Sequence, residues 1–274
     1  MFDLSKLPDE LPEATGSIQP EVRRYLAGRV GPVGSDTAGW FRLGDESLAL
    51  IDLKGEPATW HVTRTIQLPS LAAARQNRGA EIRIQAVVPG KRFLLLYPEA
   101  GGRNVLQVLD VAGEQVKYLP PAEVEPTASQ LSVLFDRFAY VSVPPANRGG
   151  GMIGTWEGTY LNIYDVSTPE KIRRIGKWDP GFPTRNMRLS PLPGKKSLVL
   201  VEEDSTGMGI HFADFSDPLR PRVLASVPTN GEGNRVASWG DKALFTSSTE
   251  ALWIDMTNPL APERLATWFN HRWF

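Results

Sequence analysis

Three segments of the chain align without gaps and share one short pattern. Each reads Asp, an apolar residue, Ser or Thr, any residue and Pro, and then continues into a run in which apolar residues recur. The segments are YDVSTPEKIRRIGKW from Tyr164, ADFSDPLRPRVLASV from Ala213 and IDMTNPLAPERLATW from Ile254. Agreement at so many fixed offsets indicates an internal repeat, which decides the architecture before any local feature does.

The pattern has a physical explanation in a rigid hairpin. An Asp that ends a strand can accept hydrogen bonds from backbone N–H groups two residues further on, and a following Ser or Thr reinforces the turn. The Pro then fixes φ near about −65° and prevents the strand from continuing. Each segment therefore predicts two antiparallel strands joined by an Asp-capped turn.

Two weaker copies of the pattern lie upstream, at residues 47–53 (SLALIDL) and 106–111 (LQVLDV). The residues predicted to cap the five turns are Asp52, Asp110, Asp165, Asp214 and Asp255. Their spacings of 58, 55, 49 and 41 residues are typical of four-stranded propeller blades, which take roughly 40–50 residues each plus loop insertions. A second hairpin precedes most copies, as in QLSVLF and FAYVSVP on either side of Asp136-Arg137.

The 25 Gly and 23 Pro residues are spread along the 274-residue chain, which indicates many turns and short elements. Together with the repeat they predict an all-β fold, a β-propeller of about five four-stranded antiparallel blades. A partial propeller completed by another chain or by missing sequence is the alternative. Residues 1–19 are predicted to form an N-terminal arm, and residues 20–274 a single propeller domain.

Charge and composition narrow the classes of function. Lys and Arg number 30 against 31 Asp and Glu, a net charge of −1 that argues against a nucleic-acid binder and against a polybasic membrane contact. The sequence has no cysteine, which excludes disulfides, thiolate catalysis and Cys-based metal sites. Its first residues lack the apolar stretch of a secretory signal, and no apolar run approaches the ~18 residues of a membrane helix. We therefore expect a cytoplasmic protein that does not insert into a membrane, or an exported one if a signal has been trimmed from the sequence.

The repeat resembles that of a known family. The Asp–apolar–Ser/Thr–x–Pro hairpin, with Ala139-Tyr140-Val141 one strand earlier, is similar to the LVIVD-repeat β-propellers of bacteria and archaea. The resemblance covers residues 129–268, whereas the first two units lack the Ser/Thr–x–Pro element. It implies the propeller architecture and says little about activity.

Motifs for catalysis or cofactor binding are incomplete. Gly149, Gly151 and Gly154 fit G-x-G-x-x-G, but the residues that follow predict a strand where dinucleotide binding requires a helix. The three histidines have no metal-ligand spacing, and no G-x-S-x-G turn marks a nucleophilic serine. The sequence thus predicts no cofactor and no catalytic residue, and leaves metal binding open.

Propeller geometry gathers one set of loops around the central channel, and binding concentrates on loops held by a rigid scaffold. The residues predicted to lie on this face are Arg103, Arg148, Trp156, Arg185, Glu203, Asp204, Glu232 and Asn234. Trp156 lies in a Gly-rich insertion, where it either folds back as a plug or contacts a partner. Trp178 and Trp268 share one repeat position and are predicted to pack in the core between blades.

These features favour a non-enzymatic scaffold that presents its loop-rich face or a sheet edge to a protein partner. Membership of a larger multi-subunit assembly fits the same features, because unpaired blade edges invite association. The alternative function is a propeller hydrolase of the lactonase type, with a metal held in its central funnel.

Overall fold

The computed structural model describes the chain at residues 33–35, 38–43, 47–54, 57–71, 81–99, 101–144, 159–181, 187–192, 198–203, 209–229, 233–247 and 249–269. The arm predicted for residues 1–19 lies outside these described residues. Within them, the strands run antiparallel in five sheets, so the all-β prediction is confirmed.

Each sheet is built from strands that are consecutive in the sequence. The first sheet holds β1 (Val33–Ser35), β2 (Ala38–Leu43), β3 (Ser47–Asp52) and β4 (His61–Gln67). The second holds β5 (Arg83–Val88), β6 (Arg92–Pro98), β7 (Asn104–Asp110), β8 (Lys117–Tyr118) and β9 (Ala122–Val124). The third holds β10 (Gln130–Leu134), β11 (Phe138–Val143), β12 (Tyr160–Asp165) and β13 (Arg173–Trp178). The fourth holds β14 (Met187–Pro191), β15 (Leu198–Glu203), β16 (Ile210–Asp214) and β17 (Arg222–Val227), and the fifth holds β18 (Gly233–Trp239), β19 (Lys242–Ser247), β20 (Glu250–Asp255) and β21 (Glu263–Phe269). Two short 3-10 helices, η3 (Pro57–Thr59) and η4 (Pro169–Lys171), lie in the turns before β4 and β13.

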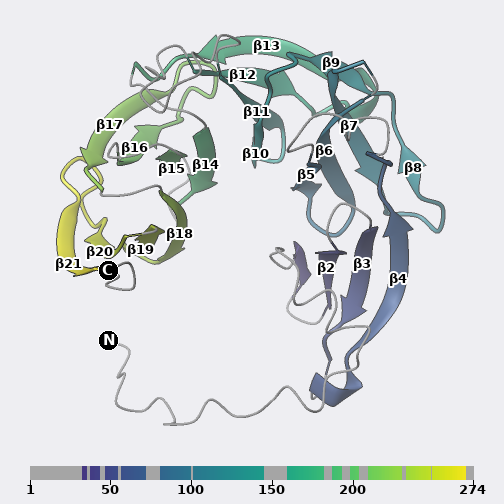
Figure 1. Cartoon of the computed structure of the whole chain (residues 1–274), viewed down its shortest axis with the longest axis horizontal. Helices are drawn as coiled ribbons and strands as arrows, with labels where there is room; N and C mark the ends of the chain where they lie inside the picture. Colours follow the sequence, from purple (N-terminus) through teal and green to yellow (C-terminus); the bar gives the residue numbers. More distant parts are fainter. Residues whose placement is uncertain are drawn as a thin grey trace.

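The outer strand of the second sheet is divided in two. β8 and β9 both pair with β7, β8 near its end and β9 near its beginning. Pro120 and Pro121 lie between β8 and β9. Proline has no N–H to donate to a strand ladder, so the pair of prolines accounts for the interruption. The division leaves β9 as a separate edge strand beside the third sheet (Figure 1).

The five Asp residues of the repeat make the same contact in every sheet. Each Asp Oδ1 accepts a hydrogen bond, 2.8–3.0 Å long, from the backbone N–H two residues on. In the last three repeats the residue two positions on is Ser or Thr, and its hydroxyl donates a further hydrogen bond to the same oxygen. The hydrogen bonds from Ser167, together with a smaller contribution from Arg137, lower the pKa of Asp165 to about 2. The turn thus depends on an ionised carboxylate.

Successive sheets are joined by shared hydrophobic clusters. One cluster lies between each pair of neighbours, from the first and second sheets to the fourth and fifth. A separate cluster around Phe41, Ala49 and Ile51 contains residues of the first sheet alone. Figure 1 shows the five sheets following one another around an open arc, with the first and fifth sheets at its ends.

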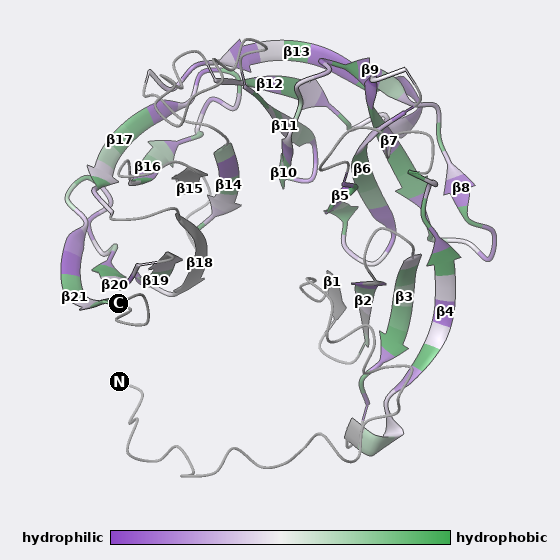
Figure 2. Cartoon of the chain, in the orientation of Figure 1, coloured by the Kyte–Doolittle hydropathy of each residue, from purple (hydrophilic) through white to green (hydrophobic). Residues whose placement is uncertain are grey.

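Strand alternation explains how one sheet contributes to two clusters. In β12, Leu161 and Ile163 pack toward the fourth sheet, while Tyr164 packs toward the second. Because successive side chains of a strand point to opposite faces, the third strand of each internal sheet (β7, β12 and β16) contributes to the clusters with both neighbouring sheets. Outer strands are more polar: in Figure 2, β13 shows hydrophilic residues where β3 is hydrophobic over most of its length.

A register shift recurs next to the turns. It falls between Leu50 and Ile51 in the first sheet, and between Ile163 and Tyr164 in the third. The fourth and fifth sheets have it at the equivalent position. Each shift leaves one extra residue in the outer strand, which is a β-bulge. The extra residues are Thr63, Ile175, Leu224 and Leu265.

Candidate functional site

Most residues of the predicted loop face lie outside the described residues; these are Arg148, Trp156, Arg185, Asp204 and Glu232. Glu203 ends β15 opposite Met187, and Asn234 lies in β18 at a register shift. For both residues the structure describes the backbone position alone. Arg103 precedes β7, and its exposed side chain forms an ion pair with Glu99 at 3.4 Å. A shared site for these residues therefore stays a prediction.

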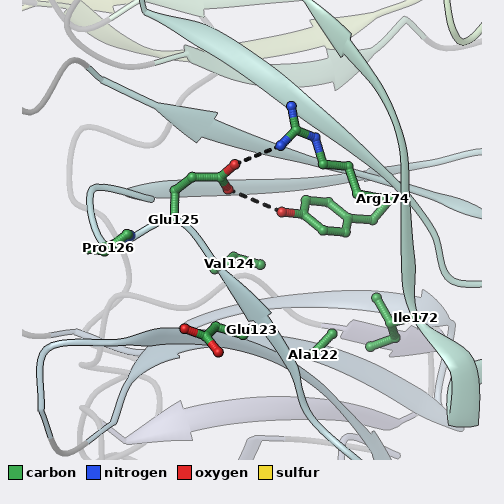
Figure 3. Close-up of a pocket in the computed structure, with 8 residues that line it drawn as sticks. Ala122, Glu123, Val124, Glu125, Pro126, Ile172 and Arg174 are labelled. Carbon is green, nitrogen blue, oxygen red and sulfur yellow. Dashed lines mark hydrogen bonds and ion pairs between the residues drawn. The ribbon is translucent and has the colours of Figure 1, made fainter.

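A pocket of about 390 Å³ lies between the second and third sheets. Its lining residues come from β9 with the two residues after it, from β12, and from the turn and strand β13 that follow β12: Ala122, Glu123, Val124, Glu125, Pro126, Tyr164, Ile172 and Arg174. Figure 3 shows these side chains, with Val124, Ala122 and Ile172 facing the space below the polar group. The pocket thus has an apolar part and a charged part.

Glu125 organises the charged part of the pocket. Its Oε1 accepts a hydrogen bond from Arg174 Nη1 at 3.0 Å, and its Oε2 accepts one from the Tyr164 hydroxyl at 3.3 Å (Figure 3). Burial, and then the charge of Glu125, raise the pKa of the Tyr164 phenol above its ordinary value. Because Tyr164 stays protonated, it donates to Glu125 at any ordinary pH. Both oxygens of Glu125 are therefore engaged within the chain, which fixes the position of this carboxylate beside the apolar part of the pocket.

The Glu125–Arg174 pair carries no mark in the sequence. The two residues are separated by 49 positions and belong to different repeats. Every outer strand of the repeats has charged residues, so Arg174 does not stand out in β13. Glu125 follows the interruption at Pro120 and Pro121. The interruption indicates an edge strand, but it does not indicate that Glu125 meets Arg174.

The fifth sheet has an apolar face that no further sheet of the described residues follows. Register places Trp178, Val227 and Trp268 at one repeat position, opposite Leu161, Ile210 and Ala251 respectively. Trp178 is 7% exposed and Val227 5% exposed, because each packs against the next sheet. Trp268 is 53% exposed. The prediction that Trp268 is core was therefore wrong, because the described residues provide no sheet beyond the fifth.

The residues around Trp268 share its apolar character. Leu252 and Ile254 pack toward the fourth sheet, so alternation puts the neighbouring residues of β20 on the opposite face. The side chains described on that face of β19, β20 and β21 are Lys242, Leu244, Thr246, Ala251, Trp253, Asp255, Glu263, Ala266 and Trp268. The three charged ones, Lys242, Asp255 and Glu263, lie at the end of the sheet next to the Asp255 turn, where Lys242 forms an ion pair with Asp255. We call the six uncharged residues, with the exposed bulge residue Leu265, the open face.

The described residues contain no group of three or more His, Asp and Glu side chains that could hold a metal ion. His211 lies in β16, buried, with Nδ1 2.7 Å from the hydroxyl of Ser226. No helix among the described residues is long and apolar enough to cross a membrane.

No protein-family model matches the chain, and no curated protein matches it by sequence. Solved structures of similar fold include a functionally unknown protein from Desulfotomaculum acetoxidans, with a TM-score of 0.62 and 10% identity over 85% of this chain and 67% of that one. A hypothetical selenium-binding protein from Sulfolobus tokodaii has a TM-score of 0.57 and 11% identity, over 90% of this chain and 62% of its own.

A third similar structure is the complex of KlAtg21 with the coiled coil of AgAtg16, with a TM-score of 0.52 and 12% identity over 85% of this chain and 68% of that one. The chain spans 62–68% of the three solved chains, about two thirds of their length. At identities of 10–12% these likenesses concern the fold alone.

Proposed function

We propose that the chain is a β-propeller of the LVIVD-repeat type, with the five sheets as its blades, and that it serves as a non-enzymatic scaffold for a protein partner. The Asp-capped hairpin repeat supports the architecture, as do the five consecutive antiparallel sheets around an open arc. Other chains similar in fold include one that was solved in complex with a coiled coil. The open face of the fifth sheet carries the functional part of the proposal.

The partner presents an apolar sheet face to the open face. The repeat supports this choice of occupant, because the equivalent faces of the third and fourth sheets are covered by a β-sheet with alternating apolar residues. The uncharged region around Trp268 favours an uncharged partner surface there, because a desolvated charge on the partner would stay unpaired. Exposed tryptophan is also the residue type most enriched at the energetic centres of protein interfaces.

Replacing Trp268 with Ser is expected to abolish capture of the partner from host extracts. The measurement is an affinity purification from the native host, followed by mass spectrometry, with the wild type and the variant compared. Leu219→Ser is the matched control, because Leu219 is a similarly exposed apolar residue (41%) in the turn between β16 and β17. A photo-reactive residue in place of Leu265 should form a cross-link to the same partner.

Two results would contradict this proposal. One is a partner that Trp268→Ser and Leu219→Ser retain equally, since the open face would then not hold it. The other is a change of the purified chain from dimer to monomer on Trp268→Ser, measured by sedimentation velocity. That change would identify a second copy of the chain as the occupant.

A further inference from the structure

The outer strand of the third sheet is the most basic outer strand of the last three repeats. From Pro169 to Trp178 the chain has four basic side chains and one acidic one. The equivalent stretch of the fourth sheet, residues 218–227, has two basic side chains, and that of the fifth, residues 259–268, has one of each sign. The basic residues of the third sheet are Lys171, Arg173, Arg174 and Lys177.

These charges are accessible. The Arg173 side chain is 73% exposed, and its contact to Asp165 is long, at 3.7 Å. Asp165 already accepts closer bonds from Ser167 and Arg137. Lys177 lies with its Nζ 3.6 Å from the centre of the Tyr160 ring, a cation–π contact that holds the charge at the surface. A ligand can therefore reach both Arg173 and Lys177.

The backbone of β13 forms an open edge. β13 is the last strand in the order of the third sheet, and within the described part of the chain no strand pairs with its outer side. Such an edge offers a row of N–H and C=O groups at strand spacing. Basic side chains on an edge strand also discourage self-association, but that role needs no pocket beside the strand.

The pocket described above lies beside this edge. Arg174 belongs both to β13 and to the pocket lining, and Val124 and Ile172 supply its apolar part. Register places Lys177 opposite Asn162, on the pocket side of β13 with Arg174, and Arg173 opposite Asp165, on the other side. In an added strand, alternate side chains would point toward the pocket and Lys177, while the others point to the side of Arg173. The edge, the charges and the pocket together match one kind of ligand.

We propose that β13 binds an extended acidic segment of a protein, which adds to the third sheet as a further strand. Its acidic side chains pair with Arg173 and Lys177, and one apolar side chain enters the pocket between β9 and β13. A peptide fits better than a nucleic acid, because the open N–H and C=O groups of β13 can pair with a peptide backbone and not with a sugar–phosphate backbone. This surface is separate from the open face, so the inference does not depend on the partner proposed there.

A fluorescently labelled peptide of about ten residues, with Glu at positions on both faces and a single central Val, provides the test, with binding followed by fluorescence anisotropy. The double variant Arg173→Gln/Lys177→Gln is expected to weaken binding at least about tenfold. Arg222→Gln is the matched control, because Arg222 stands opposite Asp214 as Arg173 stands opposite Asp165, with a side chain 78% exposed. The control should change the affinity by less than about twofold.

Two further ligands separate strand addition from simple charge attraction. A peptide of the same charge with proline at alternate positions cannot pair as a strand, and its binding should be lost. Equal binding of that peptide would overturn strand addition.

Equal loss in Arg222→Gln, or no loss in the double variant, would overturn the assignment to β13. If single-stranded DNA binds as tightly as the peptide, with the same dependence on Arg173 and Lys177, the proposed peptide ligand is wrong and the ligand is a nucleic acid. Circular dichroism spectra that match the wild type establish that both variants are folded.

Discussion

Replacing Trp178 with Ala is expected to lower the free energy of unfolding by about 3–5 kcal/mol. Trp178 is buried between the third and fourth sheets, where its ring meets Phe215 edge-on at 5.4 Å. Phe215 in turn meets Tyr140 at 5.4 Å, so removal of the indole leaves a cavity in an aromatic cluster that joins two sheets. Urea denaturation followed by tryptophan fluorescence and by circular dichroism measures the loss.

Trp268→Ala is the matched control for this prediction. It removes the same side chain from the same repeat position, but the side chain is 53% exposed, so the expected loss is less than about 1 kcal/mol. Trp178→Phe should recover part of the stability lost in Trp178→Ala, because an aromatic ring remains against Phe215. Equal losses at Trp178 and Trp268 would contradict the difference in burial between the two faces.

Replacing Asp165 with Ala is expected to cost about 2 kcal/mol near neutral pH. The change removes the acceptor of the Ser167 N–H and hydroxyl and the partner of Arg137, and leaves the turn donors without their bonds. Asp52 gives the comparison, because among the described residues its carboxylate accepts only the N–H of Lys54. Asp52→Ala should therefore cost about 1 kcal/mol or less, measured by the same urea denaturation.

The effect of Asp165 also depends on pH. Its pKa is lowered from 3.8 to about 2 in the folded chain, so the ionised form stabilises the fold. That stabilisation is complete above the ordinary pKa and is lost as the pH falls through the interval from 3.8 to about 2. The difference in stability between the wild type and Asp165→Ala should stay constant from neutral pH down to the start of that interval and shrink within it. A difference that grows as the pH falls would contradict this account.

The hairpins could be predicted from the sequence because their causes are local. Asp, Ser or Thr, and Pro occupy fixed positions within five residues, and each acts on its own turn. The spacing of Asp165, Asp214 and Asp255 then located successive sheets. In the second sheet, where the Ser/Thr–x–Pro element is missing, the outer strand is divided and the pattern no longer describes it.

Burial at the repeat position could not be predicted, because it depends on a distant part of the chain. Trp178 and Trp268 occupy equivalent local sequences, and only the presence of a following sheet makes one of them core. The same limit applies to the pocket. Glu125 and Arg174 meet because two sheets pack side by side, and neither local sequence contains that information.

The serial packing of the sheets has a consequence for how the molecule opens. Each internal sheet is coupled to two neighbours through a hydrophobic cluster, whereas the fifth is coupled to one. In such a linear array, cooperativity passes only between adjacent modules, so fluctuations that break backbone hydrogen bonds start at the termini of the series. Amide hydrogen exchange should accordingly be slowest in β11 and β12 and faster in β19 and β20, a gradient of protection that follows the order of the chain.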